Sequence, residues 1–317
     1  MRTRLITLLT LAALFGIAPA AHAHAGDEIY PFLELLEEDL ERIDLTDGSV
    51  EDWVDVLGEP SLTASDFVWG SPGAPAEYDP SEVDFRIWLA WHWGSGTLWA
   101  AMERVDDIYV NRYDGDPFNM VDWDSSIVLF VDGDHSGGRF TYVRPYFCEG
   151  CTAEQLQEDN RQAQMWIAIG EAPDGEHLLH IGAGREWVAR EPYAGAGGGA
   201  FGDNPAISVT ELRVTPFDDL VYDDEEASVA SELHPGKVIG LDIWTRDNDD
   251  PSRSTVEWGI FMSLSESDMR SRAHADFFVD GLLLAAGEDP SLYDGDKDSA
   301  VEPSSWARIK AALRVRP

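Results

Sequence analysis

Tryptophans placed beside turns are the first residues of this chain whose side chains could bind a ligand. An indole ring offers a flat apolar face that can stack on the C–H face of a sugar ring, while neighbouring carboxylates, amides or arginines bind the sugar hydroxyls. The predicted ligand-binding residues are the tryptophans nearest to turns or polar neighbours: Trp88, Trp93, Trp123 and Trp258. The alternative for each of them is core packing, which is the more common role of a buried aromatic side chain.

The stretch "FRIWLAWHWGSGTLWAAMERVDD", residues 85–107, shows how this alternative can be weighed. Successive side chains of a strand point to opposite faces of a sheet. The face predicted to lie in the core carries Phe85, Ile87, Leu89, Trp91 and Trp93. Trp88 lies on the other face with Arg86 and His92, which makes that face mixed in polarity.

Acidic turns are the second group of residues that could do chemistry. "DGDHSGG" and "RDNDD" each place several acids in one turn, and the predicted metal ligands within them are Asp132, Asp134, Asp247 and Asp249. Carboxylates held together repel one another, and a calcium ion with six to eight oxygen ligands relieves that repulsion. Solvated turns without a metal are the alternative, because Asp and Asn favour turns through their own hydrogen bonds. Calcium is therefore predicted as a structural ion.

The two cysteines, Cys148 and Cys151 in "FCEGC", are predicted to form a local disulfide. Attachment of a c-type haem would need a histidine at position 152, where the chain has Thr152. His177 and His180 face opposite sides of a predicted strand, so a zinc site there is not favoured.

The N-terminus and the net charge indicate where the protein works and what it binds. Residues 1–25 combine Arg2 and Arg4, an apolar run and an A-x-A pattern at Ala23 and Ala25, which is typical of a secretory signal peptide. The formal net charge of -38 disfavours nucleic acid and anionic lipid as partners. We expect an exported protein, periplasmic or extracellular and not inserted in a membrane, that binds neutral ligands or cations.

Four segments organise the chain: the signal peptide over residues 1–25, a helical lead-in over 26–61, a β-sandwich over 62–286, and an acidic linker with a C-terminal helix over 287–317. The lead-in places Phe32, Leu36, Leu40 and Ile43 on one helical stripe. Ten later runs alternate with a period of two, which predicts a mainly β, antiparallel, jelly-roll-like sandwich. Within it, a helix is expected after Tyr222, and "AGAGGGAFG", residues 194–202, is expected to be a flexible loop.

Three motifs occur in the order found in a known family. They are "GSGTLWAAMERVDD", "WDSSIVLFVDGDHSGG" and "GKVIGLDIWTRDNDD", and with them residues 62–286 resemble the family 9 carbohydrate-binding modules and the related DOMON-type sandwiches. On that resemblance Asp106 and Asp107 match the paired acids after the second strand. Asp132 matches the acid that closes a later strand, and Asp247 and Asp249 match the late acidic turn.

The resemblance implies an exported, non-catalytic protein that binds an oligosaccharide or polysaccharide between tryptophans and carries structural calcium. Two alternatives remain open: a structural envelope or matrix sandwich without a sugar ligand, and a secreted glycan-active hydrolase or lyase on a similar sandwich. Reducing-sugar release separates binding from hydrolysis, and a glycan array separates binding from scaffolding.

Overall fold

The computed structural model describes residues 28–293 except 72–73, 116–119, 121–122, 140–157, 159–160, 182–185, 203–204, 251–259 and 266–269. Several predictions lie outside the described residues. They are the signal peptide over 1–25, the disulfide between Cys148 and Cys151, the role of Trp258, and the helix expected over 304–317.

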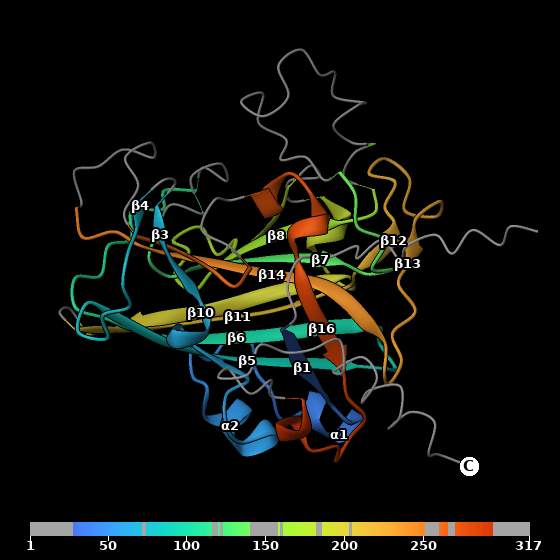
Figure 1. Cartoon of the computed structure of the whole chain (residues 1–317), viewed down its shortest axis with the longest axis horizontal. Coiled ribbons are helices and arrows are strands. Elements are labelled where there is room, and N and C mark those ends of the chain that lie inside the picture. Colours follow the sequence, from blue (N-terminus) through green and yellow to red (C-terminus); the bar gives the residue numbers. More distant parts are fainter. Residues whose placement is uncertain are drawn as a thin grey trace, which may run out of the picture.

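Strands dominate the described residues and pack as a sandwich (Figure 1), which confirms the predicted fold class. The two α-helices are short and both lie in the lead-in, α1 at Glu37–Leu40 and α2 at Glu51–Leu57. No helix among the described residues is long and apolar enough to cross a membrane. The strands are β1 (Ile29–Glu34), β2 (Leu62–Thr63), β3 (Val68–Ser71), β4 (Ala74–Pro75), β5 (Val83–His92), β6 (Thr97–Asp106), β7 (Ser126–Asp132), β8 (Gln164–Ile169), β9 (Leu178–His180), β10 (Ala194–Phe201), β11 (Ala206–Val214), β12 (Phe217–Asp219), β13 (Val229–Ala230), β14 (Val238–Asp247), β15 (Ile260–Ser263) and β16 (Val279–Leu283).

Strand β1 joins the two halves of the sandwich. Its residues 29–32 pair with β16, and its residues 33–34 pair with β5, both in parallel. One half continues from β5 through β6 and β11 to β10. The other half is centred on β14, which pairs with β16 and β15 along one edge and with β7 along the other. Among the described strands, every pairing other than those of β1 is antiparallel.

The main core lies between these halves and contains most of the predicted inner face of β5. Phe85, Ile87, Leu89 and Trp91 are all buried in it, as the alternation predicts. The fifth residue of that face, Trp93, is exposed because β5 ends at His92 and Trp93 lies in the turn that follows. The Trp91 Nε1 donates a hydrogen bond to the Leu284 carbonyl at 2.8 Å, so this indole has no unpaired polar atom in the core.

The opposite face of the β5–β6–β11–β10 half is covered by the lead-in. Trp53 of α2, together with Leu35, packs into a second buried cluster that includes Trp88 and Trp99. Trp53 is 0% exposed, and its Nε1 donates to the buried carboxylate of Glu211 on β11 at 2.7 Å. Where the lead-in packs on this half of the sandwich, both faces of the sheet are therefore buried. Where the lead-in does not reach, the outer face of the sheet is open to solvent.

The glycine-rich segment 194–202 forms strand β10 over most of its length, so the predicted flexible loop is wrong. Its glycines allow the lead-in to approach the sheet at backbone distance. A Cβ atom on Gly197 would lie 2.1 Å from the Leu45 carbonyl oxygen, and one on Gly48 of the lead-in would lie 3.3 Å from the Gly199 nitrogen. Without side chains at these positions, the loop between α1 and α2 packs directly on β10.

Two helical predictions are also wrong. Residues 29–34 form β1 rather than the start of the lead-in helix, because pairing with a strand on each side outweighs the helical stripe read from Phe32 onward. After Tyr222 the chain forms turns and then β13. There Ser228 Oγ donates to the Val221 and Asp224 carbonyls, and such side-chain bonds to the backbone compete with a helix.

Candidate functional site

Of the predicted tryptophan platforms in the described part of the chain, Trp93 is at the surface. It follows β5 in the turn to β6, and 57% of its surface is exposed. Trp88 is 0% exposed and its Nε1 donates to the Gly58 carbonyl at 3.0 Å, whereas Trp123 is 6% exposed within another buried cluster. Trp88 and Trp123 are therefore core residues rather than platforms, because other parts of the chain cover both indoles. Trp93 stays a prediction.

The four predicted calcium ligands do not meet at one site. Asp132 ends β7 opposite Gly240, whereas Asp247 lies at the far end of β14, which places them roughly 23 Å apart at ~3.3 Å per strand residue. Asp132 is buried and accepts from the Gly137 N–H at 2.7 Å, while the exposed Asp134 accepts from the Ser136 N–H at 3.0 Å. These two carboxylates close their own turn through hydrogen bonds.

Four of the five acids matched by the family resemblance, all except Asp132, lie in two neighbouring acidic groups near the end of β6. Oxygen atoms of Asp106, Asp124 and Asp247 lie within 4.8 Å of one another, and all three side chains are buried. A second group of the same size joins Asp107, Asp249 and Glu82 nearer the surface. The acids at the end of β6, Asp106 and Asp107, therefore lie next to the acids at the end of β14, Asp247 and Asp249.

Arg104 supplies the positive charge within the buried group. Its guanidinium is 0% exposed, bonds to Asp106, donates to Asp247 at 2.8 Å and lies 3.7 Å from Asp124. Burial raises the pKa of Asp247 to about 7 and that of Asp124 well above its usual range, while Arg104 acts in the opposite direction. The arginine thus has the electrostatic role that the sequence interpretation gave to calcium at Asp247. Calcium as a bound ion stays a prediction.

Arg104 was not singled out in the sequence, although a signal for it exists. In β6 it shares the inner face with Leu98, Ala100 and Met102. A charged side chain on the face of a strand that points into the core needs a buried partner of opposite charge. Asp106, two residues later on the same face, is that partner.

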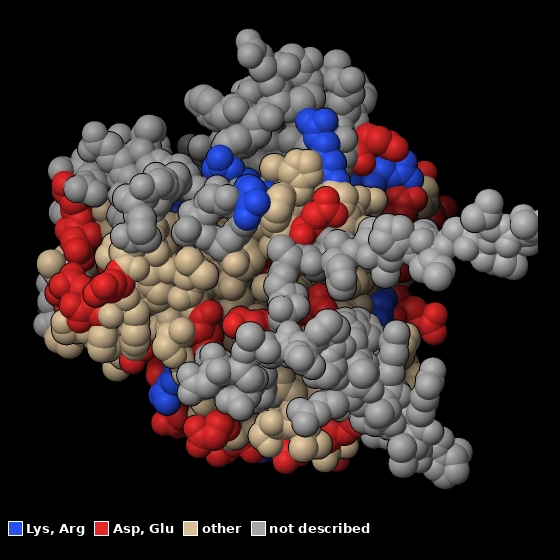
Figure 2. All heavy atoms as spheres, in the orientation of Figure 1, with Lys and Arg blue, Asp and Glu red and all other residues tan. Residues whose placement is uncertain are grey.

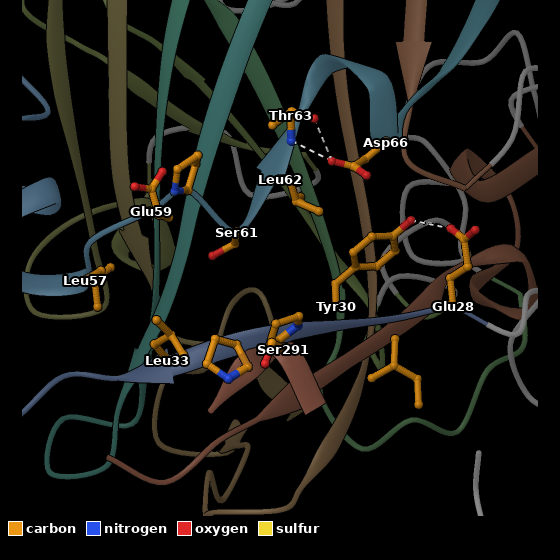
Figure 3. Close-up of a pocket in the computed structure, with 14 residues that line it drawn as sticks. Glu28, Tyr30, Leu33, Leu57, Glu59, Ser61, Leu62, Thr63, Asp66 and Ser291 are labelled. Atoms are coloured by element: carbon orange, nitrogen blue, oxygen red, sulfur yellow. Dashed lines mark hydrogen bonds between the residues drawn. The ribbon is translucent and has the colours of Figure 1, made fainter. Parts of the chain in front are cut away.

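A pocket of about 830 Å³ opens beside the start of β1 (Figure 3). Its volume lies in the range of about 300–1,000 Å³ usual for small-molecule sites. Three separate segments line it: β1 with the residues before it, the stretch from the end of α2 to the 3-10 helix at 64–66, and Pro290 with Ser291. Sequence reasoning missed this pocket because it expected a helix where β1 runs and because the three segments are far apart in the chain.

The pocket lining combines polar and apolar groups. Its carboxylates and aliphatic hydroxyls belong to Glu28, Glu59, Asp66, Ser61, Thr63 and Ser291, and its partly exposed apolar residues are Ile29, Pro31, Leu33, Leu57, Pro60 and Pro290.

Several of the polar groups are held in place by bonds that Figure 3 shows. The Tyr30 hydroxyl donates to Glu28 at 2.5 Å, and the Thr63 N–H donates to Asp66 at 2.7 Å. Burial, and then the bond to Glu28, raise the pKa of Tyr30, so its hydroxyl remains a donor at neutral pH. In Figure 2, Asp and Glu lie in patches mainly along the left and lower edges of the visible face. The formal net charge of -38 means that the protein would repel an anionic ligand.

No family model matches the chain, and no curated protein matches it. Among solved structures, a carbohydrate binding module of family 9 from Caldicellulosiruptor kristjanssonii in complex with glucose has a TM-score of 0.44 and 10% sequence identity, covering 83% of this chain and 98% of the module. A second structure from that organism, a family 9 module in complex with cellotriose, has a TM-score of 0.43 and 11% identity, covering 87% of this chain and 98% of the module. Both modules belong to the family that the sequence motifs resemble.

Proposed function

We propose that this protein binds a neutral carbohydrate in the pocket beside β1 and does not act on it chemically. The observation that carries the proposal is the lining of that pocket, which combines carboxylates and hydroxyls with partly exposed apolar side chains. A sugar has the matching chemistry, because its hydroxyls bind oxygen-rich side chains while its C–H faces pack on apolar surface.

The charge of the lining narrows the ligand further. Glu28, Glu59 and Asp66 bring three carboxylates to the pocket wall. Carboxylates accept hydrogen bonds from hydroxyl groups and repel uronic acids or sulfated sugars. The proposed ligand class is therefore a neutral oligosaccharide, or the end of a neutral polysaccharide.

Replacing Glu59 with alanine tests the site. Glu59 is exposed at the pocket wall, so the variant should fold as the parent does, while losing a hydrogen bond to a charged group. Such a bond is worth about 1.5–3 kcal/mol, so the affinity for the sugar should fall roughly 10-fold or more. Calorimetric titration with a panel of neutral oligosaccharides gives the affinity, and Glu77→Ala, an exposed acid outside the pocket, is the matched control.

Three outcomes would contradict the assignment. Absence of binding by the unmodified protein at millimolar sugar would remove the function itself. Loss of binding in Trp93→Ala, with Glu59→Ala unaffected, would move the site to the exposed indole at the β5–β6 turn. Release of reducing ends from any oligosaccharide that binds would favour the hydrolase alternative.

Export belongs to the same proposal and is supported by the composition of residues 1–25. N-terminal sequencing of protein recovered from the periplasm or medium should find a mature chain that begins after the Ala21–Ala25 region. Protein that keeps Met1 and stays inside the cell would contradict export.

A further inference from the structure

The loop between α1 and α2 and the first turn of α2 carry acids that lie close to the sheet. It approaches β10 at Gly197 and lies beside Glu211 on the neighbouring strand β11. Asp47 is exposed, Asp52 is half-buried and Glu211 is fully buried. One oxygen of each carboxylate lies within 4.8 Å of an oxygen of the other two.

One carboxylate oxygen of Glu211 has no hydrogen-bond partner among the described residues. Its Oε1 accepts from the Trp53 Nε1 at 2.7 Å, whereas its Oε2 is buried and has no hydrogen-bond partner among the described residues. Burial, together with the negative charges of Asp52 and Asp47, raises the pKa of Glu211 to about 8. A buried carboxylate oxygen without a partner is costly, and the carboxylate that carries it belongs to this group of acids.

Asp47 of the loop and Asp52 of the first turn of α2 are already held in position. Asp47 Oδ1 accepts from the Ser49 N–H at 2.8 Å, and Asp52 Oδ2 accepts from the Asp44 N–H at 2.8 Å. Each oxygen that accepts one hydrogen bond keeps a further lone pair, so these bonds fix the carboxylates without exhausting them.

We infer that Asp47, Asp52 and Glu211 bind one divalent cation of the calcium class, which links the lead-in to β11. Calcium–oxygen bonds of about 2.3–2.6 Å allow two ligand oxygens on opposite sides of an ion to lie up to ~5 Å apart, and the observed separations fit within that limit. The exposed side of Asp47 leaves room for water to complete six to eight ligands. Within the described part of the chain, these three acids form no ion pair with Lys or Arg, in contrast to Asp106, Asp124 and Asp247, which already surround Arg104.

This inference does not depend on sugar binding, and its test uses metal alone. Terbium(III) replaces calcium in oxygen sites and emits when a nearby tryptophan is excited, and Trp53 is bonded directly to Glu211. Titration of the mature protein with terbium should give saturable emission that calcium displaces. Glu211→Gln keeps the shape of the side chain and should weaken terbium binding at least 10-fold.

A second variant keeps the test decisive if Glu211→Gln folds poorly. Asp47 is exposed, so Asp47→Asn should fold normally and still weaken terbium binding several-fold, while Asp223→Asn, another exposed acid, should have no effect. Calcium should also raise the Tm of the unmodified protein, as expected for a ligand that binds only the folded state. That increase should shrink in Asp47→Asn.

The inference is overturned if the unmodified protein binds neither terbium nor calcium at millimolar concentration. It is also overturned if Glu211→Gln and Asp47→Asn bind terbium as the unmodified protein does, since the metal would then lie in another acidic group.

Discussion

Replacing Arg104 with methionine is expected to destabilise the protein by about 3–5 kcal/mol at pH 7, the usual cost of removing one partner from a buried ion pair. The side chain is 0% exposed and is bonded to Asp106 and Asp247, with Asp124 3.7 Å away. Methionine fills similar space but leaves these buried carboxylates without a counter-charge. Urea unfolding followed by fluorescence measures the free energy of unfolding.

The deficit of this variant should depend on pH in a defined direction. The pKa of Asp247 is raised to about 7 in the folded protein, chiefly by burial, against about 3.9 for an unfolded aspartate. Its ionisation therefore costs folded-state stability, and that cost appears as the pH rises from about 4 through 7. Without Arg104 the cost grows, so the deficit should be largest above pH 7 and smaller near pH 5.

Arg86→Met provides the control for Arg104→Met. Arg86 lies on the neighbouring strand β5 and pairs with Glu103, but its side chain is half exposed. Exposed ion pairs contribute about 0–1 kcal/mol, so this variant should lose little stability. Equal losses in the two variants would show that Arg104 does not neutralise a buried acidic group.

Acidification is expected to destabilise the protein through His180, and His180→Phe should remove that part of the loss. Burial lowers the pKa of His180 to about 3, and neither ring nitrogen has a hydrogen-bond partner among the described residues. The unfolded chain takes up a proton on this histidine below about pH 6.5, which the folded protein resists. The stabilising effect of a neutral His180 is thus complete above pH 6.5 and is lost as the pH falls towards 3.

At pH 5 this linkage amounts to about 2 kcal/mol, taking about 1.4 kcal/mol per pH unit below 6.5. Urea unfolding at pH 7 and pH 5 should show the parent losing that much more than His180→Phe, whose phenyl ring preserves the ring contacts with Trp166 and Tyr222. His234→Phe, an exposed site, should follow the parent. A pH dependence of His180→Phe identical to that of the parent would contradict the assignment.

Much of the sandwich could be predicted because half-buried strands record their inner face in the sequence. The alternation along residues 85–107 identified the inner face of β5 and the core position of Trp91. Strand β1 could not be recognised because it is short and pairs in parallel with two strands distant in sequence. Strand β10 was missed because glycine weakens every local preference for a strand.

The binding residues were harder to predict because they depend on what covers each face. Trp88 has polar neighbours in sequence, yet it is buried because the lead-in packs over it. The pocket beside β1 needs three separate segments, none of which carries a motif. By contrast, the grouping of Asp106 and Asp107 with the acids after β14 agrees with the matches made from the family motifs.

The contact between the lead-in and the glycines of β10 bears on how this sandwich can be separated from the rest of its chain. Sandwich domains are commonly exchanged between proteins as independent units, with cuts placed just before the first recognised strand. Here a cut before residue 62 would remove β1 from between β5 and β16 and expose Trp88 together with a row of backbone otherwise covered by Leu45. A unit that is to be moved to another protein should therefore begin at residue 28 or earlier. We also expect that any relative with the glycines of β10 has a lead-in that packs on them.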